Sequence, residues 1–268
     1  MAISQPQRRE GEAQFTDGNN ILGHDLATSI QETFFAYANR NSDDNRSAQV
    51  HLGPSEIGTP CDRRIAMSLM GIRPVNPGGD GFAAWLGTQG HAGMAEIFEW
   101  ADGRSGRYAV ETKLSFPSKL VPRGTGDLLD RSFRNYGGVF IDWKFMGFYA
   151  LKHLREYGAS DLYRVQLQTY AFGAHIRGEK VKHIALVGMP RQGSSLSEMF
   201  VWTQPFDKSI GEAALRRVEE IDRQIRERGD RMDNKDLIAS FPIADDCKYC
   251  DFYQARSTDL THACNGKD

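Results

Sequence analysis

An aspartate and a lysine two positions apart, Asp142 and Lys144, have the spacing in this sequence that best suits catalysis. The surrounding residues 137–144, GGVFIDWK, read as a β-strand, and successive side chains of a strand point to opposite faces. Asp142 and Lys144 therefore project side by side from one face. A carboxylate there can hold a divalent cation that polarises a phosphate and activates water, while the ammonium group offsets developing charge. The pair is suited to phosphodiester hydrolysis.

A second carboxylate is needed, because Mg²⁺ is usually held through one or two acidic side chains. Asp127 supplies it, in the segment Gly124-Thr-Gly-Asp127 of an expected strand over residues 120–130. If this strand and the next pair in antiparallel fashion, Asp127 and Asp142 can reach one ion. We therefore predict a site for Mg²⁺ or Mn²⁺ between the two strands.

A competing motif lies upstream, where Glu111-Thr-Lys113 also places an acid and a lysine two positions apart on an expected strand. This motif lacks a Gly-x-x-Asp partner before it, and choosing it would leave Asp127 and Asp142 without a role. The later pair is therefore the preferred interpretation. Several basic residues in short clusters are read as solvated surface: Arg63, Arg64, Lys113, Lys119 and Arg123.

Two expected helices contribute polar residues on either side of this pair. His91 lies on the first, over residues 82–100. Gln166 and Tyr170 lie one turn apart on the second, over residues 161–177, and so share a face. Each feature alone is common, because a helical histidine is usually packed or solvated and an Asp-x-Lys pair often lies on a surface. Their joint occurrence in this order is far more specific.

The ordered set resembles the PD-(D/E)XK nuclease superfamily, in which a Gly-x-x-Asp segment precedes a strand with Asp-x-Lys. The upstream histidine and the downstream Gln-x-x-x-Tyr are similar to those of its RecB-like branch, and the resemblance covers roughly residues 54–175. It implies an α/β fold of the restriction-endonuclease-like type, a mixed sheet flanked by helices. It also implies a metal-dependent exonuclease acting on single-stranded DNA, in phage recombination or replication or in CRISPR spacer acquisition.

The resemblance further implies a role for each matching residue. The metal ligands would be these groups: His91, Asp127, Asp142 and the backbone carbonyl of Trp143. Lys144 would position or activate water, and Gln166 and Tyr170 would orient Lys144 and contact the DNA backbone. Aromatic side chains nearby, such as Trp143 and Tyr163, could stack on the bases of a single strand.

Four cysteines form a second pattern: Cys61, Cys247, Cys250 and Cys264. In a reducing compartment a disulfide is the less favoured use of a Cys-x-x-Cys pair, and a metal or cluster site is the better first interpretation. One cysteine precedes the nuclease motifs and three follow them, which is similar to the iron–sulfur branch of the superfamily. That branch includes the fourth CRISPR-associated (Cas) protein and bacteriophage exonucleases. The resemblance implies a cluster, of the [4Fe–4S] type, on these four residues.

Alternatives stay open for the cysteines. Thirteen residues separate Cys250 from Cys264, more than is usual in that branch, so His262 stands as a substitute for the last ligand. A tetrahedral Cys₄ zinc site is a second alternative, and four free thiols are a third. The iron–sulfur cluster is preferred because of the resemblance and not because of the spacing.

The chain is expected to have three parts. Residues 1–50 would hold a polar tail and an amphipathic helix, residues 51–240 the nuclease core, and residues 241–268 a cysteine clasp packed on the Cys61 helix. The further expected elements are helices over residues 25–39, 60–70 and 209–229 and strands over residues 107–114, 181–189 and 199–203. Thr59 is expected to cap the 60–70 helix, which places Cys61 in its first turn.

A capping box and a set of helix glycines lead to two further expectations. A capping box, Ser209-Ile-Gly-Glu212, is expected to open the helix that ends at Gly229. Three glycines interrupt the 82–100 helix: Gly87, Gly90 and Gly93. Because glycine inside a helix costs about 1 kcal/mol relative to alanine, we expect a neighbour to approach this backbone closely.

Composition is ordinary for a soluble globular protein, with 40% hydrophobic and 25% charged residues. No run of about 18 apolar residues marks a membrane span and no secretory signal opens the chain, so a cytoplasmic location is expected. A net charge of −2 argues mildly against nucleic-acid binding by charge alone, although positive groups need only line one groove. The expected partner is DNA, with a homo-oligomer or a recombination or CRISPR protein as further candidates. The competing interpretation is a non-catalytic DNA-binding or partner-binding module with a structural zinc site.

Overall fold

The structure is a computed structural model of the 268-residue chain, and it describes residues 21–39, 51–76, 81–245, 247 and 250–267. The chain falls into two compact units, residues 1–46 and residues 47–268. The helices of the described residues are α1 (Ile21–Asn39), α2 (Pro54–Ile57), α3 (Asp62–Leu69), α4 (Phe82–Asp102), α5 (Phe148–Tyr157), α6 (Asp161–Ile176), α7 (Lys208–Gly229) and α8 (Asn234–Ala239), with 3₁₀ turns at Arg134–Tyr136 and Leu196–Glu198. Within these ranges, no helix combines the length and the apolar character needed to cross a membrane.

In its described part, the first unit is helix α1. The amphipathic helix expected over residues 25–39 is present and begins earlier, at Ile21. Leu22, Leu26 and Ile30, spaced four residues apart, form an exposed apolar stripe along it. The N-terminal helical extension predicted from the sequence is therefore confirmed.

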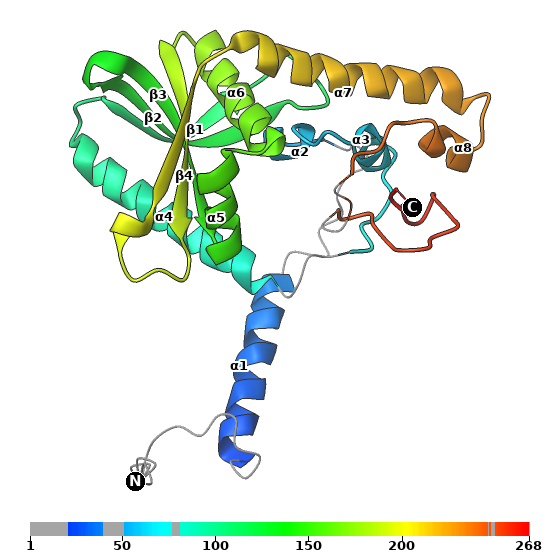
Figure 1. The fold of residues 1–268 in the computed structure, drawn as a ribbon, viewed down its shortest axis with the longest axis horizontal. Helices are drawn as coiled ribbons and strands as arrows, with labels where there is room; N and C mark the ends of the chain where they lie inside the picture. The colour runs from blue at the N-terminus through cyan, green and yellow to red at the C-terminus, as the bar shows by residue number, and fades with distance from the viewer. Residues whose placement is uncertain (1–20, 40–50, 77–80, 246, 248–249, 268) are drawn as a thin grey trace. The chain divides into compact units, whose positions relative to one another are not determined.

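A mixed sheet forms the centre of the second unit (Figure 1). In the described chain it has five strands in the order β1-β2-β3-β4-β5: β1 (Tyr108–Ser115), β2 (Arg123–Phe133), β3 (Gly137–Met146), β4 (Val181–Pro190) and β5 (Phe200–Pro205). Strands β3 and β4 are parallel, and the other neighbouring pairs are antiparallel. The parallel pair requires a crossover connection, which α5 and α6 provide.

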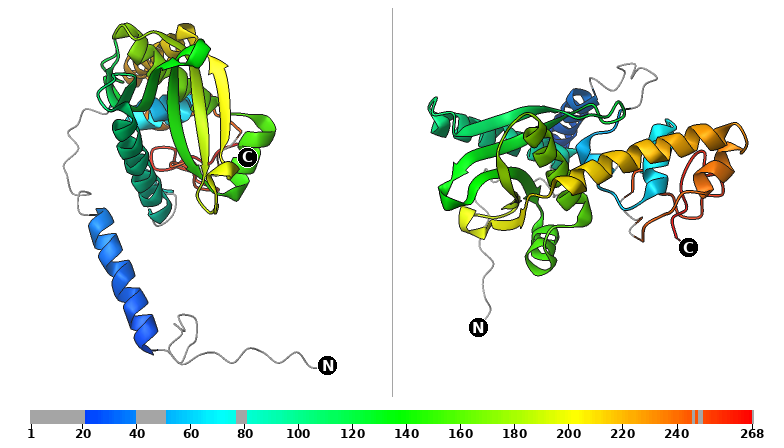
Figure 2. Two further views of the ribbon diagram at one scale, coloured as in Figure 1. Left: turned by 90° about the vertical axis from the view of Figure 1, so that its left-hand side faces the viewer. Right: turned by 90° about the horizontal axis from the view of Figure 1, so that it is seen from above.

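Helices cover both faces of the sheet (Figure 2). On one face, the Phe98 ring of α4 stacks on Trp143 with 5.5 Å between centroids. On the other face, the Tyr170 ring of α6 lies 6.2 Å from Phe140. Because Phe140 and Trp143 are three positions apart in β3, they point to opposite faces, as the alternation predicted. The predicted fold class, a restriction-endonuclease-like mixed sheet flanked by helices, is confirmed.

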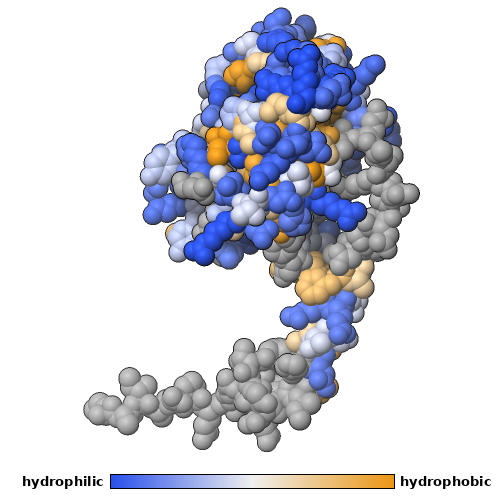
Figure 3. All heavy atoms as spheres, turned by 90° about the vertical axis from the view of Figure 1, so that its right-hand side faces the viewer, coloured by the Kyte–Doolittle hydropathy of each residue, from blue (hydrophilic) through white to orange (hydrophobic). Residues whose placement is uncertain are grey.

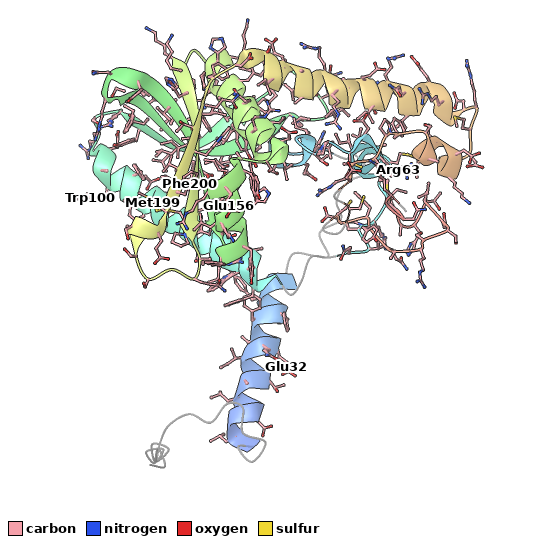
Figure 4. The ribbon with its side chains drawn as sticks, viewed as in Figure 1. Glu32, Arg63, Trp100, Glu156, Met199 and Phe200 are labelled. Carbon is pink, nitrogen blue, oxygen red and sulfur yellow. The ribbon has the colours of Figure 1, made fainter. Side chains whose placement is uncertain are left out.

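Helix α7 leads from the sheet to a smaller lobe built from α3, α8 and the C-terminal segment (Figures 1 and 2). This lobe has its own apolar core: Met67, Ile238, Phe252, Leu260 and Cys264. Arg63 of α3 holds the segment in place, because its Nη2 donates to the carbonyl of Ala239 and its backbone N–H to that of Pro242, each at 3.0 Å (Figure 4). The surface on this side is largely hydrophilic with small apolar patches, so the lobe turns its apolar side chains inward (Figure 3).

The helix caps differ from those expected. Cys61 is the N-cap of α3, and its Sγ accepts the Arg64 N–H at 3.3 Å, so the prediction that Thr59 caps this helix is wrong. At α7 the cap is Asp207, whose Oδ1 accepts the Ser209 N–H at 2.9 Å. A carboxylate is favoured there over a serine because it also interacts with the positive end of the helix dipole. Helices α2, α5 and α8 were not expected from the sequence.

Candidate metal-dependent active site

Asp127 lies where the alternation of strand β2 breaks. Gly126 faces the α6 side of the sheet, where an added Cβ would lie 2.3 Å from the Phe140 ring. Leu128, two residues on, belongs to the apolar cluster of Trp143 on the α4 side. A regular strand would place Gly126 and Leu128 on one face. The irregularity directs the Asp127 carboxylate toward α4 and toward the backbone of β3.

Both oxygens of the Asp127 carboxylate have a partner. Oδ1 lies 3.2 Å from Nδ1 of His91, and Oδ2 accepts the backbone N–H of Trp143 at 2.8 Å. The hydrogen bond to Asp127 raises the pKa of His91. The carboxylate therefore connects helix α4 to strand β3, and these contacts fix its orientation.

The close approach of α4 to the sheet depends on one of the three helix glycines. A Cβ at Gly90 would lie 2.3 Å from the Phe145 ring, so only glycine fits there. A Cβ at Gly87 or Gly93 would meet nothing within 4 Å. The expected close approach is therefore present at Gly90 alone, immediately before His91.

Glu111 completes a group of three ligands with His91 and Asp127. One ligand atom of each residue lies within 4.8 Å of the other two, and among the described residues no other set of acids, histidines and cysteines does so. Glu111 has φ +45°, a conformation that is uncommon outside glycine and costs about 1–3 kcal/mol. Desolvation and the nearby Asp127 carboxylate raise the pKa of Glu111. We call His91, Glu111 and Asp127 the ligand group.

Asp142 and Lys144 form an ion pair on the α6 side of β3, with 2.7 Å between Nζ and Oδ2. The Asp142 residue is only 3% exposed. Burial raises the pKa of Asp142 to about 6, although the Lys144 ammonium acts in the opposite direction. Lys144 thus offsets only part of the cost of burying this charge.

Helix α6 covers this ion pair with polar and aromatic side chains. Gln166 Nε2 donates to Asp142 Oδ1 at 3.4 Å, and the Lys144 Nζ lies 5.5 Å from the centroid of the Tyr163 ring. Tyr170, one turn beyond Gln166, is buried, and burial raises its pKa to about 12. The acid and the lysine are therefore held from adjacent turns of one helix.

The residues expected from the sequence fall into two adjoining sets. One contains His91 and Asp127, and the other contains Asp142, Lys144, Gln166, Tyr163 and Tyr170. Asp142 lies outside the ligand group, because its oxygens contact Lys144 and Gln166. That Asp142 shares an ion with His91 and Asp127, and that Gln166 and Tyr170 orient Lys144, stay predictions.

Glu111 is the member of the ligand group that the sequence interpretation set aside. In the competing Glu111-x-Lys113 motif no ion pair joins the two side chains within the described residues, and Lys113 Nζ donates instead to Thr125 Oγ1 at 3.1 Å. Its glutamate nevertheless joins the ligand group. The β1–β2 register, in which Thr112 pairs with Gly126, places Glu111 opposite Asp127. That register is the signal that could have identified Glu111.

The four cysteines line one cavity of ≈ 590 Å³ between α3 and the C-terminal segment. None of them, all within the described residues, forms a disulfide. Cys264 is buried, and its sulfur accepts the Gly266 N–H at 3.4 Å. Burial raises the pKa of the Cys250 thiol. His262 is exposed and lies outside the described lining, so the structure places Cys264, and not His262, with the other three.

No family model matches the chain, and no curated protein matches its sequence. Among solved structures it is similar to the crystal structure of SSO0001, with a TM-score of 0.46, 14% identity and coverage of 83% of this chain and 94% of that one. It is also similar to an alkaline exonuclease, LHK-Exo from Laribacter hongkongensis, with a TM-score of 0.42, 14% identity and coverage of 75% and 100%. Values this low carry no argument about activity, which rests on the site itself.

We predict that Glu111→Gln weakens Mn²⁺ binding, because an amide is a poorer ligand than a carboxylate for a hard cation. The dissociation constant should rise at least about tenfold, the lower end of what even outer-shell substitutions produce. Electron paramagnetic resonance of Mn²⁺ added to metal-free protein measures it. Glu111 and Glu96 both line a cavity of ≈ 430 Å³, but only Glu111 belongs to the ligand group. Glu96→Gln is therefore the matched control. Unchanged affinity in Glu111→Gln would exclude Glu111.

We predict that Asp142→Asn stabilises the metal-free protein in a pH-dependent way. The pKa of Asp142 in the folded protein, about 6, lies above its ordinary value of 3.8, so the folded state binds this proton more tightly than the unfolded state. Wild type should therefore lose stability relative to the variant as pH rises from about 4 to above 6, by about 3 kcal/mol in total. Denaturant unfolding at both ends of this window measures the difference. A pH-independent difference would show that the pKa is not raised.

Proposed function

We propose that this protein is a metal-dependent nuclease that hydrolyses phosphodiester bonds in DNA. The observation that carries the proposal is that the ligand group adjoins the buried Asp142–Lys144 pair. The two are joined at Trp143, which lies between Asp142 and Lys144 and donates its backbone N–H to Asp127 at 2.8 Å. This bond fixes the spacing between a cation site and an ammonium group, which is the combination that phosphodiester hydrolysis requires.

The ligand group fits Mg²⁺ or Mn²⁺. Glu111 and Asp127 offer carboxylate oxygens, which suit both ions, and the His91 imidazole is better tolerated by Mn²⁺. Asp142 is proposed as a further ligand from the adjoining pair. Such an ion, when bound, polarises the scissile phosphate and makes a water molecule more acidic.

Lys144 is proposed to stabilise negative charge on the phosphate. Its side chain is 22% exposed, so substrate can reach the ammonium group. Contacts with Asp142 and with the Tyr163 ring restrict its position before substrate arrives. Gln166 acts on Lys144 indirectly, because it donates to the other oxygen of Asp142. A charge held in advance costs little reorganisation during the reaction.

Finer aspects of the activity are proposed from the sequence resemblance alone. These are exonucleolytic action, a preference for single-stranded DNA, and a role in phage recombination or replication or in CRISPR adaptation. A cytoplasmic location and a recombination or CRISPR partner protein belong to the same proposal. The alternative is a non-catalytic DNA-binding or partner-binding module that keeps the nuclease fold.

We predict that wild type degrades linear single-stranded DNA with Mg²⁺ or Mn²⁺ and not with EDTA. Asp142→Ala and Lys144→Ala should each lower kcat at least about a hundredfold, the effect of removing one preorganised charge-stabilising group. Asp230→Ala, at the exposed end of α7, is the control and should retain activity. Circular single strands and duplexes test the expected need for a free end and a single strand.

Two outcomes of this assay would contradict the proposal in different ways. Wild-type activity that survives Asp142→Ala would overturn the assignment of the site. A lack of hydrolysis of any DNA with either metal would favour the non-catalytic binding module.

We also propose that the four cysteines hold a [4Fe–4S] cluster. A zinc ion with Zn–S bonds of about 2.3 Å in a tetrahedral site draws its sulfurs to about 4 Å from one another. Among the described residues, no three cysteine sulfurs lie within 4.8 Å of one another, although all four cysteines line the ≈ 590 Å³ cavity. The wider spacing suits a cluster better than a single ion. Bound there, it would tie the C-terminal segment to α3.

We predict that anaerobically purified protein is brown and carries about four irons per chain. Cys264→Ala should lose the iron and lower the melting temperature, because the segment is no longer tied to α3. His262→Ala is the matched control and should keep the iron. Elemental analysis that finds one zinc and no iron would support the structural zinc site instead.

A further inference from the structure

One face of the β1–β2 hairpin carries exposed polar side chains just beyond the ligand group. The register pairs Lys113 with Thr125 and Ser115 with Arg123, so these four side chains share one face. Lys113, Ser115 and Arg123 are exposed, whereas Leu114 on the opposite face is buried. This hairpin face therefore projects into solvent.

The exposed face continues directly from the ligand group. Glu111 and Asp127 lie two residues before Lys113 and two after Thr125. The break in alternation comes after Asp127, between it and Leu128, so these four side chains share one face. Lys113 therefore lies about 7 Å from the ligand group along the hairpin, and Arg123 about 13 Å from it. The bond from Lys113 Nζ to Thr125 Oγ1 holds the first cation against the sheet.

The far end of this face opens into a hollow of ≈ 640 Å³ beside the hairpin turn. Its lining contains basic and apolar residues and no acid: His51, Leu52, Gly53, Lys119, Pro122 and Arg123. A bond from the Leu52 N–H to the Leu120 carbonyl, 2.8 Å long, keeps this segment beside the turn. Within the described ranges, neither Lys119 nor Arg123 has a carboxylate partner. We call Lys113, Arg123 and Lys119 the basic strip.

We propose that the basic strip binds the sugar–phosphate backbone of the substrate strand next to the ligand group. This inference rests on the proposed nuclease function and specifies how that site holds its polyanionic substrate. The side chains of the strip offer cations and no aromatic ring, so they suit phosphates and not bases. Lys113 and Arg123 lie two positions apart along the hairpin, about 7 Å, so the two cations can contact different phosphates of one strand.

Phosphate contacts position a nucleic acid without reading its sequence. The three residues of the basic strip are therefore positioning residues, and binding through them is expected to be independent of base sequence. A lysine on the edge strand β1 could instead serve to prevent pairing with another strand. The edge carbonyl of Lys113 is already occupied, however, because Arg177 Nη1 donates to it at 2.6 Å. The need to keep the edge strand β1 from pairing with another strand therefore does not explain the three cations.

Binding in EDTA tests the strip without hydrolysis. With labelled oligo-dT and oligo-dA, Lys113→Ala/Arg123→Ala should raise the dissociation constant about fivefold to tenfold for both sequences. The slope of log affinity against log salt should become shallower by about 1.4, which corresponds to two lost phosphate contacts on a single strand. Lys208→Ala/Arg231→Ala is the matched control, because both residues are exposed cations, on α7 and just beyond it, whose side chains have no ion-pair partner among the described residues. Melting temperatures establish that both variants fold.

Hydrolysis supplies a second measurement. The loss of kcat/KM in Lys113→Ala/Arg123→Ala should be larger for a short oligonucleotide than for a mononucleotide nitrophenyl ester, and should lie mainly in KM. An unchanged dissociation constant and salt slope, or equal losses in the Lys208/Arg231 variant, would overturn the proposal. If wild type hydrolyses no substrate, the nuclease assignment fails while the binding measurement still decides whether the strip holds a strand.

Discussion

Burial of the Asp142 carboxylate is the constraint on which the arrangement of the core depends. A charge at this depth needs compensating partners, because leaving it unpaired inside the protein costs several kcal/mol. Lys144 supplies the opposite charge from two residues along the same strand, and Gln166 supplies a hydrogen bond from α6. Helix α6 must therefore pack against strand β3. The crossover connection between the parallel strands β3 and β4 places it there.

The pKa of Asp142 shows that this compensation is incomplete. If the lysine fully balanced the burial, the pKa would stay near or below its ordinary value; instead it is raised to about 6. A cation bound nearby would offset the cost of burying the Asp142 carboxylate, because added positive charge favours the ionised form of this group. The same reasoning applies to Glu111, whose pKa is raised and whose backbone adopts an unfavourable φ. Both features cost folding free energy, and a cation bound in the proposed site would offset part of that cost.

The sequence predicted the centre of the fold better than its edges. The Asp142–Lys144 strand and the Gln166–Tyr170 helix carry their own periodicity, so local patterns were sufficient to place them. Helix α5 was missed because its ten residues, following directly on a strand, read as a connection. Glu111 was set aside because its place in the ligand group depends on a register between strands and on a broken alternation at Asp127, neither of which is a local property. The cap at Asp207 was missed for a related reason, since Asp207 and Ser209, two positions apart, are both suitable caps for the same helix end.

The distribution of charge would allow a chain with a net charge of −2 to bind a polyanion, as proposed for the basic strip. The hairpin places acids and bases in sequence along one face: Glu111 and Asp127 lie where a cation is needed, and Lys113 and Arg123 lie next along the strands. Because the Debye length is about 8 Å at physiological salt, a phosphate near Arg123 is largely screened from the acids about 13 Å away. A divalent cation on the ligand group would remove most of the remaining repulsion. Local order of charge, and not the total, therefore decides whether this face attracts a nucleic-acid strand.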